Sequence, residues 1–408
     1  MRVAFVVPTL QRSGGVLVIA RHARLLRERA GVDAALVVLD EPASTDRQDD
    51  GGTPVLGAGV AAARAWDVAA WTWWTTMDLA LDLDARRRVL MLQGLDERFY
   101  RWWEAFDRLA AGAALAGADA VVTASAYLGH VVGAMRPDLA PHVVPVGLDR
   151  AVFSARPRRA VEGGPLRVLV EGQPSLWLKG VDDALAAVGA MREPVEATLV
   201  ALDPASAAEV PVARVTGGLP PAGMADLYAA TDVVLKLSRG EGLGMAPLEA
   251  AAVGTPSVVT PYGGHADWLR HGINGVQAMF DDVGGTAAWL DVLARDRALL
   301  RRLADGALAT AEAWPSLEES VDGVVAALQD VVERDPPSED ARRRALARSV
   351  ARHVDLGRLA FARRTGEVAQ AERHVELLVS STTYQLAERL RRVWWRVRAP
   401  IVRRRGGR

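Results

Sequence analysis

Residues 238–256 read SRGEGLGMAPLEAAAVGTP and follow the apolar run TDVVLKL at residues 231–237. The run predicts a buried strand, the glycines predict a turn, and the alanine-rich segment predicts a helix. Two carboxylates, Glu241 and Glu249, stand eight residues apart across the turn. Free backbone N–H groups and the macrodipole at a helix start favour an anion. The pattern suits a ligand with a central phosphate and hydroxyls at both ends; two solvated glutamates beside a turn are the alternative.

Length and composition limit the classes of protein. A chain of 408 residues, half of them apolar, predicts two or three domains with cores of their own. The net charge of −1 gives no field that would steer the chain to nucleic acid, so no nucleic-acid partner is expected. Cysteine is absent, which excludes disulfides and thiolate metal sites. Residues 1–8 do not read as a signal peptide, and no apolar run approaches ~20 residues. We therefore expect a cytoplasmic protein, soluble or peripheral on the inner face of the cell membrane.

The first half of the chain predicts a doubly wound domain. An apolar run at residues 2–8, a glycine loop, a periodic helix and a strand at residues 33–40 form a βαβ unit. Gly14 and Gly15 lie in that loop, where they either make a tight turn or let the backbone approach a ligand in a cleft. Their spacing is not the G-x-G-x-x-G of a dinucleotide-binding fingerprint, which argues against a nicotinamide oxidoreductase.

Polar residues follow a later strand of this half. The strand predicted at residues 88–92 stops at Gln93, and Asp96 comes three residues later. Because the carboxyl ends of parallel strands face the ligand crevice, both residues are candidates for contacts with an acceptor. A capped start of the helix predicted at residues 99–115 is the alternative.

A new series of strands predicts a second doubly wound domain. Its first strand, residues 166–170, is followed by Lys179 and a helix from residue 181. A cation beside helix N–H groups is suited to neutralising a diphosphate, and a solvated lysine is the alternative. Four parts are therefore expected: two Rossmann-like domains at 1–152 and 165–312, a closing helix at 313–334 and a helical basic tail at 335–408.

The end of the chain differs in charge from the rest. Residues 389–408 contain nine arginines and no acidic residue. Residues 377–398 predict an amphipathic basic helix with aromatic residues, which suits an anionic membrane surface. A helix packed on the protein's own body is the alternative.

Taken together, residues 1–334 resemble a retaining GT-B glycosyltransferase of family 4. The most specific part is residues 231–276, whose Glu-x7-Glu element follows the family's donor-site pattern. The segment KGVDD at residues 179–183 matches the family's lysine–glycine segment. The resemblance implies an α/β fold in which two Rossmann-like domains face across a cleft, the first for the acceptor and the second for a nucleotide-sugar donor.

The resemblance also implies roles for the matching residues. Glu241 binds hydroxyls of the transferred sugar, and Glu249 binds the ribose of the nucleotide. Lys179 and the backbone of the glycine turn hold the diphosphate without a catalytic metal or other cofactor. The implied donor-binding set is Gln173, Val215, Gly217, Gly242, Leu243, Gly244, Met245 and Glu249, with Glu241 and Lys179 as catalytic residues and Gly14, Gly15, Gln93 and Asp96 on the acceptor side of the cleft.

Two residues depart from the family pattern. An arginine commonly follows the glycine of the first strand in the second domain, and Gln173 stands there in this chain. The diphosphate therefore loses a bidentate cation. A histidine commonly ends the fourth strand of the first domain, and Gln93 stands there. Glutamine can hydrogen-bond a sugar but cannot act as a base. The segment WWTT at residues 73–76, followed by Gln93, is similar to the rhamnosyltransferase-like branch.

We therefore expect an enzyme that moves a sugar, with retention, from a nucleoside-diphosphate sugar to a glycan or lipid-linked glycan. The segment SSTTY at residues 380–384 is similar to tails of bacterial surface-polysaccharide transferases, which implies a role in cell-surface polysaccharide synthesis. Two alternatives stay open. One is a sugar-nucleotide epimerase of the same fold, with His265 as its best-placed acid or base. The other is a catalytically inactive, membrane-associated scaffold.

Overall fold

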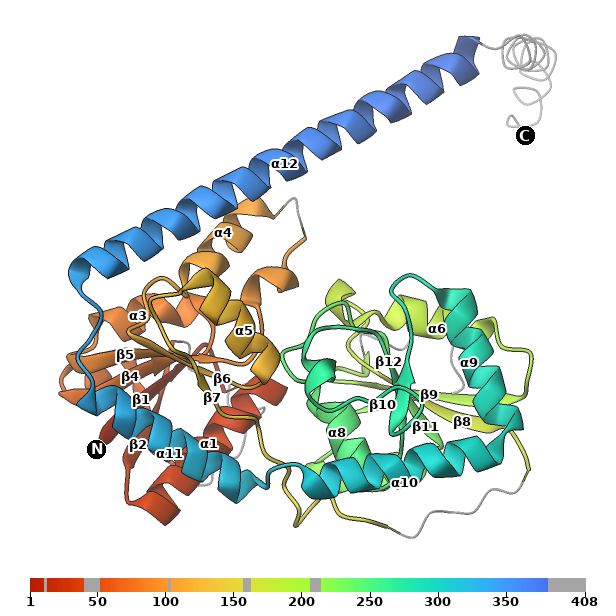
Figure 1. The fold of residues 1–408 in the computed structure, drawn as a ribbon, viewed down its shortest axis with the longest axis horizontal. Helices are drawn as coiled ribbons and strands as arrows, with labels where there is room; N and C mark the ends of the chain where they lie inside the picture. The colour runs from red at the N-terminus through yellow and green to blue at the C-terminus, as the bar shows by residue number, and fades with distance from the viewer. Residues whose placement is uncertain (11–12, 40–51, 102–103, 157–162, 206–213, 381–408) are drawn as a thin grey trace, which may run out of the picture. The chain divides into compact units, whose positions relative to one another are not determined.

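The computed structural model of the protein describes residues 1–10, 13–39, 52–101, 104–156, 163–205 and 214–380 (Figure 1). It divides into a compact unit, Met1–Val350, and a second unit that begins at Ala351. The compact unit contains two parallel sheets, and different hydrophobic clusters cover the two faces of each sheet. The predicted α/β fold of two doubly wound, Rossmann-like domains is therefore confirmed.

The first sheet has the strand order β3-β2-β1-β4-β5-β6-β7, and all its neighbouring strands are parallel. The last five residues of β1 and of β2 are all buried, because helices cover both faces of the sheet. Its strands are β1 (Arg2–Val7), β2 (Asp33–Val38), β3 (Val55–Gly57), β4 (Trp66–Trp71), β5 (Ala85–Leu92), β6 (Ala120–Thr123) and β7 (His142–Val143). Its helices are α1 (Gly14–Ala30), α2 (Ala58–Ala62), α3 (Met77–Asp82), α4 (Ala105–Ala113) and α5 (Ala126–Met135), with the 3₁₀ turns η1 (Trp74–Thr76) and η2 (Asp96–Phe99).

The second sheet has the order β10-β9-β8-β11-β12-β13, and it is parallel as well. In both sheets the strand order reverses beside the first strand, which is where ligands bind in open α/β folds. Its strands are β8 (Leu166–Glu171), β9 (Val195–Ala201), β10 (Arg214–Gly217), β11 (Val233–Lys236), β12 (Ser257–Val259) and β13 (Gly275–Gln277). Its helices are α6 (Val181–Gly189), α7 (Pro221–Ala229), α8 (Met245–Ala252), α9 (Val283–Arg295) and α10 (Arg297–Ala313), with the turns η3 (Trp177–Lys179) and η5 (Gly264–Asp267).

The helix predicted at residues 99–115 is wrong at its start. The backbone is extended at Tyr100, and the helix begins only with α4. Trp74 Nε1 donates to the Tyr100 hydroxyl at 2.8 Å, and the rings of Trp73 and Phe99 pack edge to face at 5.0 Å. These contacts with η1 hold the chain away from helical geometry, so tertiary packing overrides the local helix propensity.

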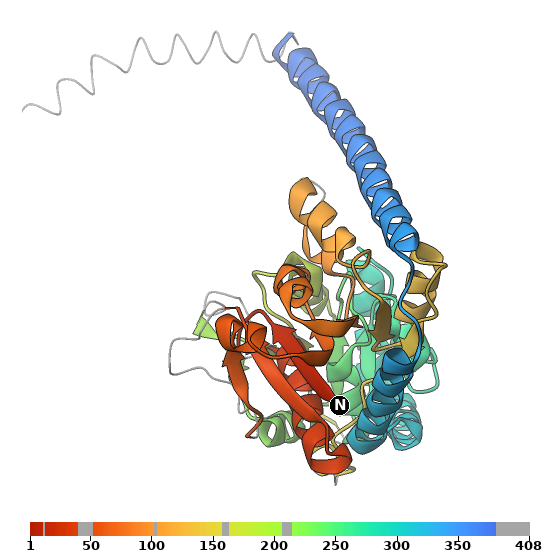
Figure 2. The same cartoon turned by 90° about the vertical axis from the view of Figure 1, so that its left-hand side faces the viewer.

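Helix α11 (Leu317–Glu333) returns from the second domain to the first (Figures 1 and 2). Ser316 and Glu319 form a capping box at its start. Just before it, Trp314 Nε1 donates to the Val146 carbonyl at 3.0 Å. Its apolar face shares a hydrophobic cluster with β1 and α1, through Leu317, Val321, Val324, Ala327, Leu328 and Val331. Helix α11 and the residues just before it thus join the second domain to the first.

Helix α12 (Glu339–Ser380) runs for 42 residues to the last residue described. The basic helix predicted at residues 377–398 falls almost wholly outside the described residues, so its membrane role stays a prediction. Among the helices that the structure describes, none combines the length and apolar character needed to cross a membrane.

Candidate active site

The carboxyl ends of β8 and β11 form the centre of the candidate site. The two strands are parallel neighbours, paired as far as Val170 with Leu235. One residue further on, Glu171 ends β8 and Lys236 ends β11. The helices that follow them, α6 and α8, begin with glycine N-caps and no capping side chain. Their first N–H groups are therefore open to an anion at this edge of the sheet.

Glu241 lies between two lysines. Its Oε1 accepts hydrogen bonds from Lys179 Nζ at 2.9 Å and from Ser238 Oγ at 2.8 Å, and Lys236 Nζ lies 3.1 Å from the same oxygen. Burial disfavours the carboxylate, but the two ammonium groups and the hydrogen bonds outweigh it and lower the pKa of Glu241 to about 2. Within the part of the chain that the structure describes, nothing donates to Oε2. Glu241 is therefore an anion held through one oxygen, with the other oxygen able to accept from a ligand hydroxyl.

Lys236 is a buried lysine that the sequence interpretation missed. Its side chain is 3% exposed, and its Nζ contacts Glu171 Oε2 as well as Glu241. Burial disfavours the ammonium ion, but the two carboxylates outweigh it and raise the pKa of Lys236 above its ordinary value. A compositional signal would have found this residue. Of the 49 basic residues in the chain, only Lys179 and Lys236 are lysines, and both contact Glu241.

The pKa of Glu249, the fifth residue of α8, is shifted in the opposite direction to that of Glu241. Burial is the largest cause and raises the pKa of Glu249 to about 8. The nearby charge of Arg21 and a hydrogen bond from the Tyr228 hydroxyl act against this rise, while the Glu171 carboxylate adds to it. At neutral pH Glu249 is therefore mostly a neutral acid, which can donate a hydrogen bond as well as accept one. Because Arg21 belongs to α1, Glu249 is within the electrostatic reach of both domains.

The turn between the two glutamates requires glycine at Gly244. Its φ is +87°, in the left-handed region, and a Cβ there would lie 2.1 Å from the Tyr262 hydroxyl. Leu243 is buried, and its carbonyl accepts a hydrogen bond from Trp268 Nε1 at 3.1 Å. Met245 then begins α8 directly. The backbone predicted to hold a diphosphate is thus a fixed turn that presents the N-terminus of α8.

The same turn contacts the first domain. The Gly242 carbonyl accepts a hydrogen bond from Ser125 Oγ at 2.7 Å, and a Cβ on Gly242 would lie 1.7 Å from the Gln93 carbonyl oxygen. Gln93 Nε2 in turn donates to the Gly15 carbonyl at 3.2 Å. Gly14 and Gly15 form the first turn of α1, not a loop before it, and a Cβ on Gly14 would meet nothing within 4 Å. The structure therefore brings Gly15, Gln93 and the donor turn together.

Lys179 ends η3, directly before α6. Gly180 follows with a φ of +60°, and a Cβ there would lie 2.0 Å from the Leu237 carbonyl oxygen. This close approach holds the start of α6 against the end of β11. The Lys179 ammonium group is thereby placed beside both the α6 N-terminus and Glu241. A cation in this position can neutralise an anion bound at the helix start.

Three residues predicted on the donor side lie further from this cluster. Gln173 Oε1 accepts a hydrogen bond from the Asp203 amide at 3.0 Å, so its side chain holds the loop after β9. Val215 and Gly217 are on β10, at the edge of the sheet, with β9 between them and β8. Two strand spacings amount to about 10 Å. Glu241 follows β11, one strand beyond β8, so a ligand that contacts both Gly217 and Glu241 must span three strand spacings, about 14 Å.

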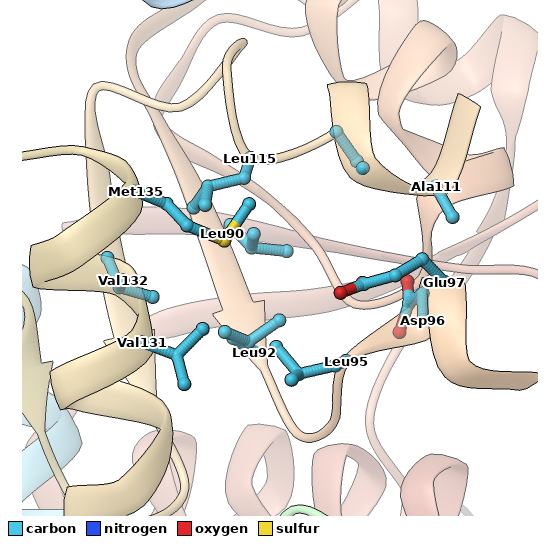
Figure 3. Close-up of a pocket in the computed structure, with 12 residues that line it drawn as sticks. Leu90, Leu92, Leu95, Asp96, Glu97, Ala111, Leu115, Val131, Val132 and Met135 are labelled. Carbon is cyan, nitrogen blue, oxygen red and sulfur yellow. The ribbon is translucent and has the colours of Figure 1, made fainter. Parts of the chain in front are cut away.

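Asp96 is buried inside the first domain, which corrects the prediction that it faces the ligand crevice. It is 8% exposed, and its Oδ2 accepts a hydrogen bond from the Trp74 amide at 2.9 Å. Burial is the largest cause of its perturbation and raises the pKa of Asp96 to about 8. With Glu97 it lines a cavity of about 20 Å³ between β5, α4 and α5, whose other walls are apolar (Figure 3). That volume holds about one water molecule. Because Asp96 accepts the hydrogen bond from the amide of Trp74, the first residue of η1, it holds η1 in place.

The comparisons with known proteins cover the part of the chain that contains these residues. The family described as "Glycosyl transferases group 1" matches residues 166–296, which include β8, η3 and the Glu241–Glu249 turn. A D-inositol 3-phosphate glycosyltransferase of Mycobacterium sp. (strain KMS) is 32% identical over 250 residues, which cover 60% of this chain and 49% of that protein. A glycogen synthase of Mycobacterium tuberculosis (strain ATCC 25618 / H37Rv) is 31% identical over 205 residues, 46% of this chain and 49% of that protein. The chain thus spans about half the length of the curated relatives it matches.

Solved structures show the same fold. The Anabaena protein HepE, in complex with UDP-glucose, superimposes with a TM-score of 0.67 over 81% of this chain and 100% of that one, at 17% identity. Sucrose-phosphate synthase from Thermosynechococcus elongatus gives a TM-score of 0.66 over 81% of this chain and 98% of that one, at 16% identity.

These findings define the class of the protein. Two Rossmann-like domains, matched over 81% of the chain by these solved structures, are the GT-B fold. Residues 166–296 match the group 1 glycosyltransferases, and this match, the relatives and the shared fold together support the predicted resemblance to a GT-B glycosyltransferase of family 4.

Proposed function

We propose that the protein is a retaining glycosyltransferase that moves a sugar from a nucleoside-diphosphate sugar to a hydroxyl of a glycan or lipid-linked glycan acceptor. We further propose that the product is a cell-surface polysaccharide. The observation that carries the proposal is the contact of Lys179 with Glu241 between two uncapped helix N-termini. That arrangement places a cation and open N–H groups beside a fixed carboxylate acceptor, which matches the chemistry of a sugar diphosphate.

The donor would lie along the carboxyl edge of the second sheet. Its diphosphate would bind the N-termini of α6 and α8 beside Lys179, and its sugar hydroxyls would donate to Glu241 Oε2. Its ribose would contact Glu249, and its base would lie near β10. The strand order supports this orientation, because about 10 Å separates β10 from β8 and a nucleotide is long enough to span it.

The main charge that develops in the reaction is on the leaving diphosphate. Lys179 and the open N–H groups would stabilise it as the bond between the sugar carbon and the phosphate oxygen breaks. The acceptor oxygen would form its bond on the same face of the sugar, and its proton would pass to the departing phosphate. Gln93 cannot take that proton, because an amide is not a base. The contact of the donor turn with Gln93 and Ser125 supports a closed arrangement that excludes water from the sugar.

The proposal is tested by a donor panel and two variants. Thermal-shift assays with UDP-, GDP- and dTDP-linked sugars would identify the nucleotide sugar that stabilises the protein. With that donor and a glycan acceptor, the wild type should form a product that carries a new glycosidic bond, and Glu241→Ala and Lys179→Ala should each form it far more slowly. Full transfer rates in both variants would contradict the assignment of the site.

The same assays separate the two alternatives. An epimerase would change the nucleotide sugar without forming a glycosidic bond, and it would need acid and base groups beside the sugar. His265 Nδ1 instead accepts a hydrogen bond from the Gly263 amide at 3.3 Å, and burial is the largest cause that lowers the pKa of His265. His265 thus supports its own turn. A scaffold that has lost its site would bind no member of the panel.

We propose that transfer needs no metal. The addition of EDTA should therefore leave the transfer rate unchanged, and a loss of rate that added Mg²⁺ restores would contradict this.

We also propose that the basic tail binds an anionic membrane surface. Flotation with phosphatidylglycerol vesicles should retain the full chain and release a chain that lacks residues 376–408. Equal flotation of both chains would contradict the proposal that the tail binds the membrane.

A further inference from the structure

Lys236 and Glu171 have no place in the proposed reaction, although they touch its central carboxylate. The four charged groups form a continuous row in which the signs alternate. Glu171 contacts Lys236, Lys236 contacts Glu241, and Glu241 contacts Lys179. The row begins at Glu171, which ends β8 and is 24% exposed, and it finishes at the N-terminus of α6, where an anion would bind.

The two lysines differ in how far they can move. Lys179 is 21% exposed and lies in a turn, whereas Lys236 is 3% exposed and lies on a central strand of the sheet. A bound diphosphate would compete with Glu241 for the Lys179 ammonium group, since both are anions. Lys236 is held by Glu171 on its other side, so it would stay in contact with Glu241.

The use of lysine at both positions is itself informative. The chain has 47 arginines and two lysines, so arginine is its default cation. A guanidinium group is a planar fork, whereas an ammonium group is compact and donates in three directions. Lys236 contacts two carboxylates that lie on different segments, β8 and the turn after β11. A compact cation that donates in three directions suits this position between the two segments.

We propose that Lys236, anchored by Glu171, is a positioning residue that keeps Glu241 ionised and fixed through Oε1 when a donor diphosphate draws Lys179 away. This inference rests on the proposed function only for the identity of the anion. Glu241 Oε2 then stays available for a sugar hydroxyl throughout the reaction. Without Lys236, the loss of Lys179 would leave a carboxylate that burial disfavours, with Ser238 as its remaining partner.

The charged groups around Glu241 allow a direct test. They are Lys179 on η3, Lys236 on β11 and Glu171 on β8, while the hydroxyl of Tyr262 lies close enough to respond to the charge of Glu241. The substitution Lys179→Met imitates the withdrawal of that lysine by a ligand. In this background, the titration of the Glu241 side chain reports whether Lys236 alone keeps it ionised.

The experiment compares full-length chains with ¹³C-labelled glutamate, in the Lys179→Met background and without any ligand. The Glu241 carboxyl signal is assigned by its loss in a Glu241→Gln variant. With Glu171 and Lys236 present, we expect it to show no titration above pH 4.5. With Glu171→Leu and Lys236→Leu, we expect its midpoint to rise by at least one pH unit. Equal midpoints in both chains would overturn the inference.

A matched control lies at the other end of the same strands. Arg167 and Asp232 form a second ion pair between β8 and β11, at their amino ends. The pair Arg167→Met and Asp232→Leu, in the same background, should leave the Glu241 midpoint unchanged. A rise equal to that of the site pair would show a general loss of packing and would overturn the inference. If the leucine pair fails to fold, Glu171→Gln with Lys236→Met keeps the side-chain lengths and makes the same comparison.

A second measurement separates this inference from the proposed function. In the protein that keeps Lys179, the Glu171→Leu/Lys236→Leu pair should lower the rate of transfer at least 30-fold with the donor found in the panel. It should also move the acidic limb of the pH–rate profile to higher pH. An unchanged pH profile would count against the positioning role. If the wild type transfers no sugar, the proposed function fails, while the ligand-free titration still decides the role of Lys236.

Discussion

The β8–β11 strand pair carries an ion pair at each end, and the two ends have different surroundings. At the amino end, Arg167 contacts Asp232, which also lies 3.5 Å from Arg297. The Arg167 amide donates to the same carboxylate at 2.9 Å. These hydrogen bonds and the two guanidinium groups lower the pKa of Asp232, although burial, the largest single cause, opposes them. The amino-end pair is therefore a closed structure in which both oxygens of the acid are used.

At the carboxyl end, the pair of Glu171 and Lys236 is open. It continues to Glu241 and Lys179, and the row finishes beside two uncapped helix starts. Glu241 keeps one oxygen without a donor among the described residues. The same pair of strands thus carries one arrangement that only stabilises the sheet and one that has capacity left for a ligand. Both ends of the strand pair carry buried charge, so charge alone does not distinguish them. They differ in that only the carboxyl end keeps an acceptor oxygen that no described residue uses.

The largest difference between the two ends is expected in transfer activity. Lys179→Ala should lower kcat/KM for the donor about 10²–10³-fold, because it removes the charge that we propose stabilises the leaving diphosphate. Its effect on unfolding should be small, since Lys179 is partly exposed. Steady-state kinetics with the donor of the panel, together with thermal unfolding, measure both effects. A loss of stability with unchanged kinetics would reverse the assignment of the two ends.

The amino end should show the opposite pattern. Asp232→Ala leaves two partly buried arginines without the buried acid that pairs with them, so it should lower the free energy of unfolding by roughly 3 kcal/mol. The kcat of the folded variant should stay within about twofold of the wild type. Because the folded-state pKa of Asp232 is lowered, its contribution is present above the unfolded pKa of about 3.9 and is lost as pH falls through the folded value. Urea unfolding at pH 7 and pH 3 checks this, with a smaller wild-type advantage expected at pH 3.

A substitution in the turn between Glu241 and Glu249 tests the carboxyl end of the strand pair through its backbone, without changing any charge. Gly244→Ala places a Cβ against the Tyr262 hydroxyl in a left-handed conformation, so it should cost about 1–3 kcal/mol of stability. Because the turn presents the N-terminus of α8, binding of the diphosphate should weaken with it. Calorimetry with the nucleoside diphosphate of the donor measures this effect. Gly31→Ala, at the far end of α1, is the matched control, since Gly31 has a left-handed φ of +61° but a Cβ there meets nothing within 4 Å, and this variant should bind as the wild type does.

The smallest effect is expected from Glu249→Gln. Its raised pKa of about 8 makes Glu249 mostly neutral at pH 7, so an amide should change donor binding less than about threefold there. The folded state holds this proton between the ordinary pKa of 4.5 and about 8, so the wild type should lose stability as pH rises through that range. The slope that Glu249 contributes is at most about 1.4 kcal/mol per pH unit. Urea titrations from pH 5 to 8 should show a flatter dependence in the variant, and identical slopes would refute the raised pKa.

The sequence was sufficient for the fold and for the centre of the site because both depend on local patterns. The apolar run before Ser238 and the glycines after it predict strand, turn and helix wherever they occur. The structure places Glu241, Lys179 and the glycine turn together, as the pattern predicted. What the turn contacts could not be predicted in the same way. The approach of Gln93 to Gly242 joins two domains that are far apart in the sequence.

Lys236 and Glu171 were not predicted from the sequence for a different reason. Lys236 and Glu171 each stand at the end of an apolar strand, and neither pattern shows that the strands are neighbours. Their pairing depends on the strand order of the folded sheet. Asp96 was misplaced for a related reason, because the order of residues after a strand does not show which way η2 turns back on η1. Only the rarity of lysine in the chain marks Lys236 in the sequence itself.

The central assignment is that the carboxyl ends of β8 and β11 are a nucleotide-sugar site with Lys179 as the mobile cation. The chain's two lysines make one measurement decisive. In a full-length chain labelled with ¹³Cε-lysine, the two side-chain signals are assigned with Lys179→Arg and Lys236→Arg. On titration with the nucleoside diphosphate of the stabilising donor, we predict a saturable shift of the Lys179 signal and a much smaller shift of the Lys236 signal. If that nucleotide stabilises the protein and neither signal moves, it binds elsewhere and the assignment of this site is contradicted.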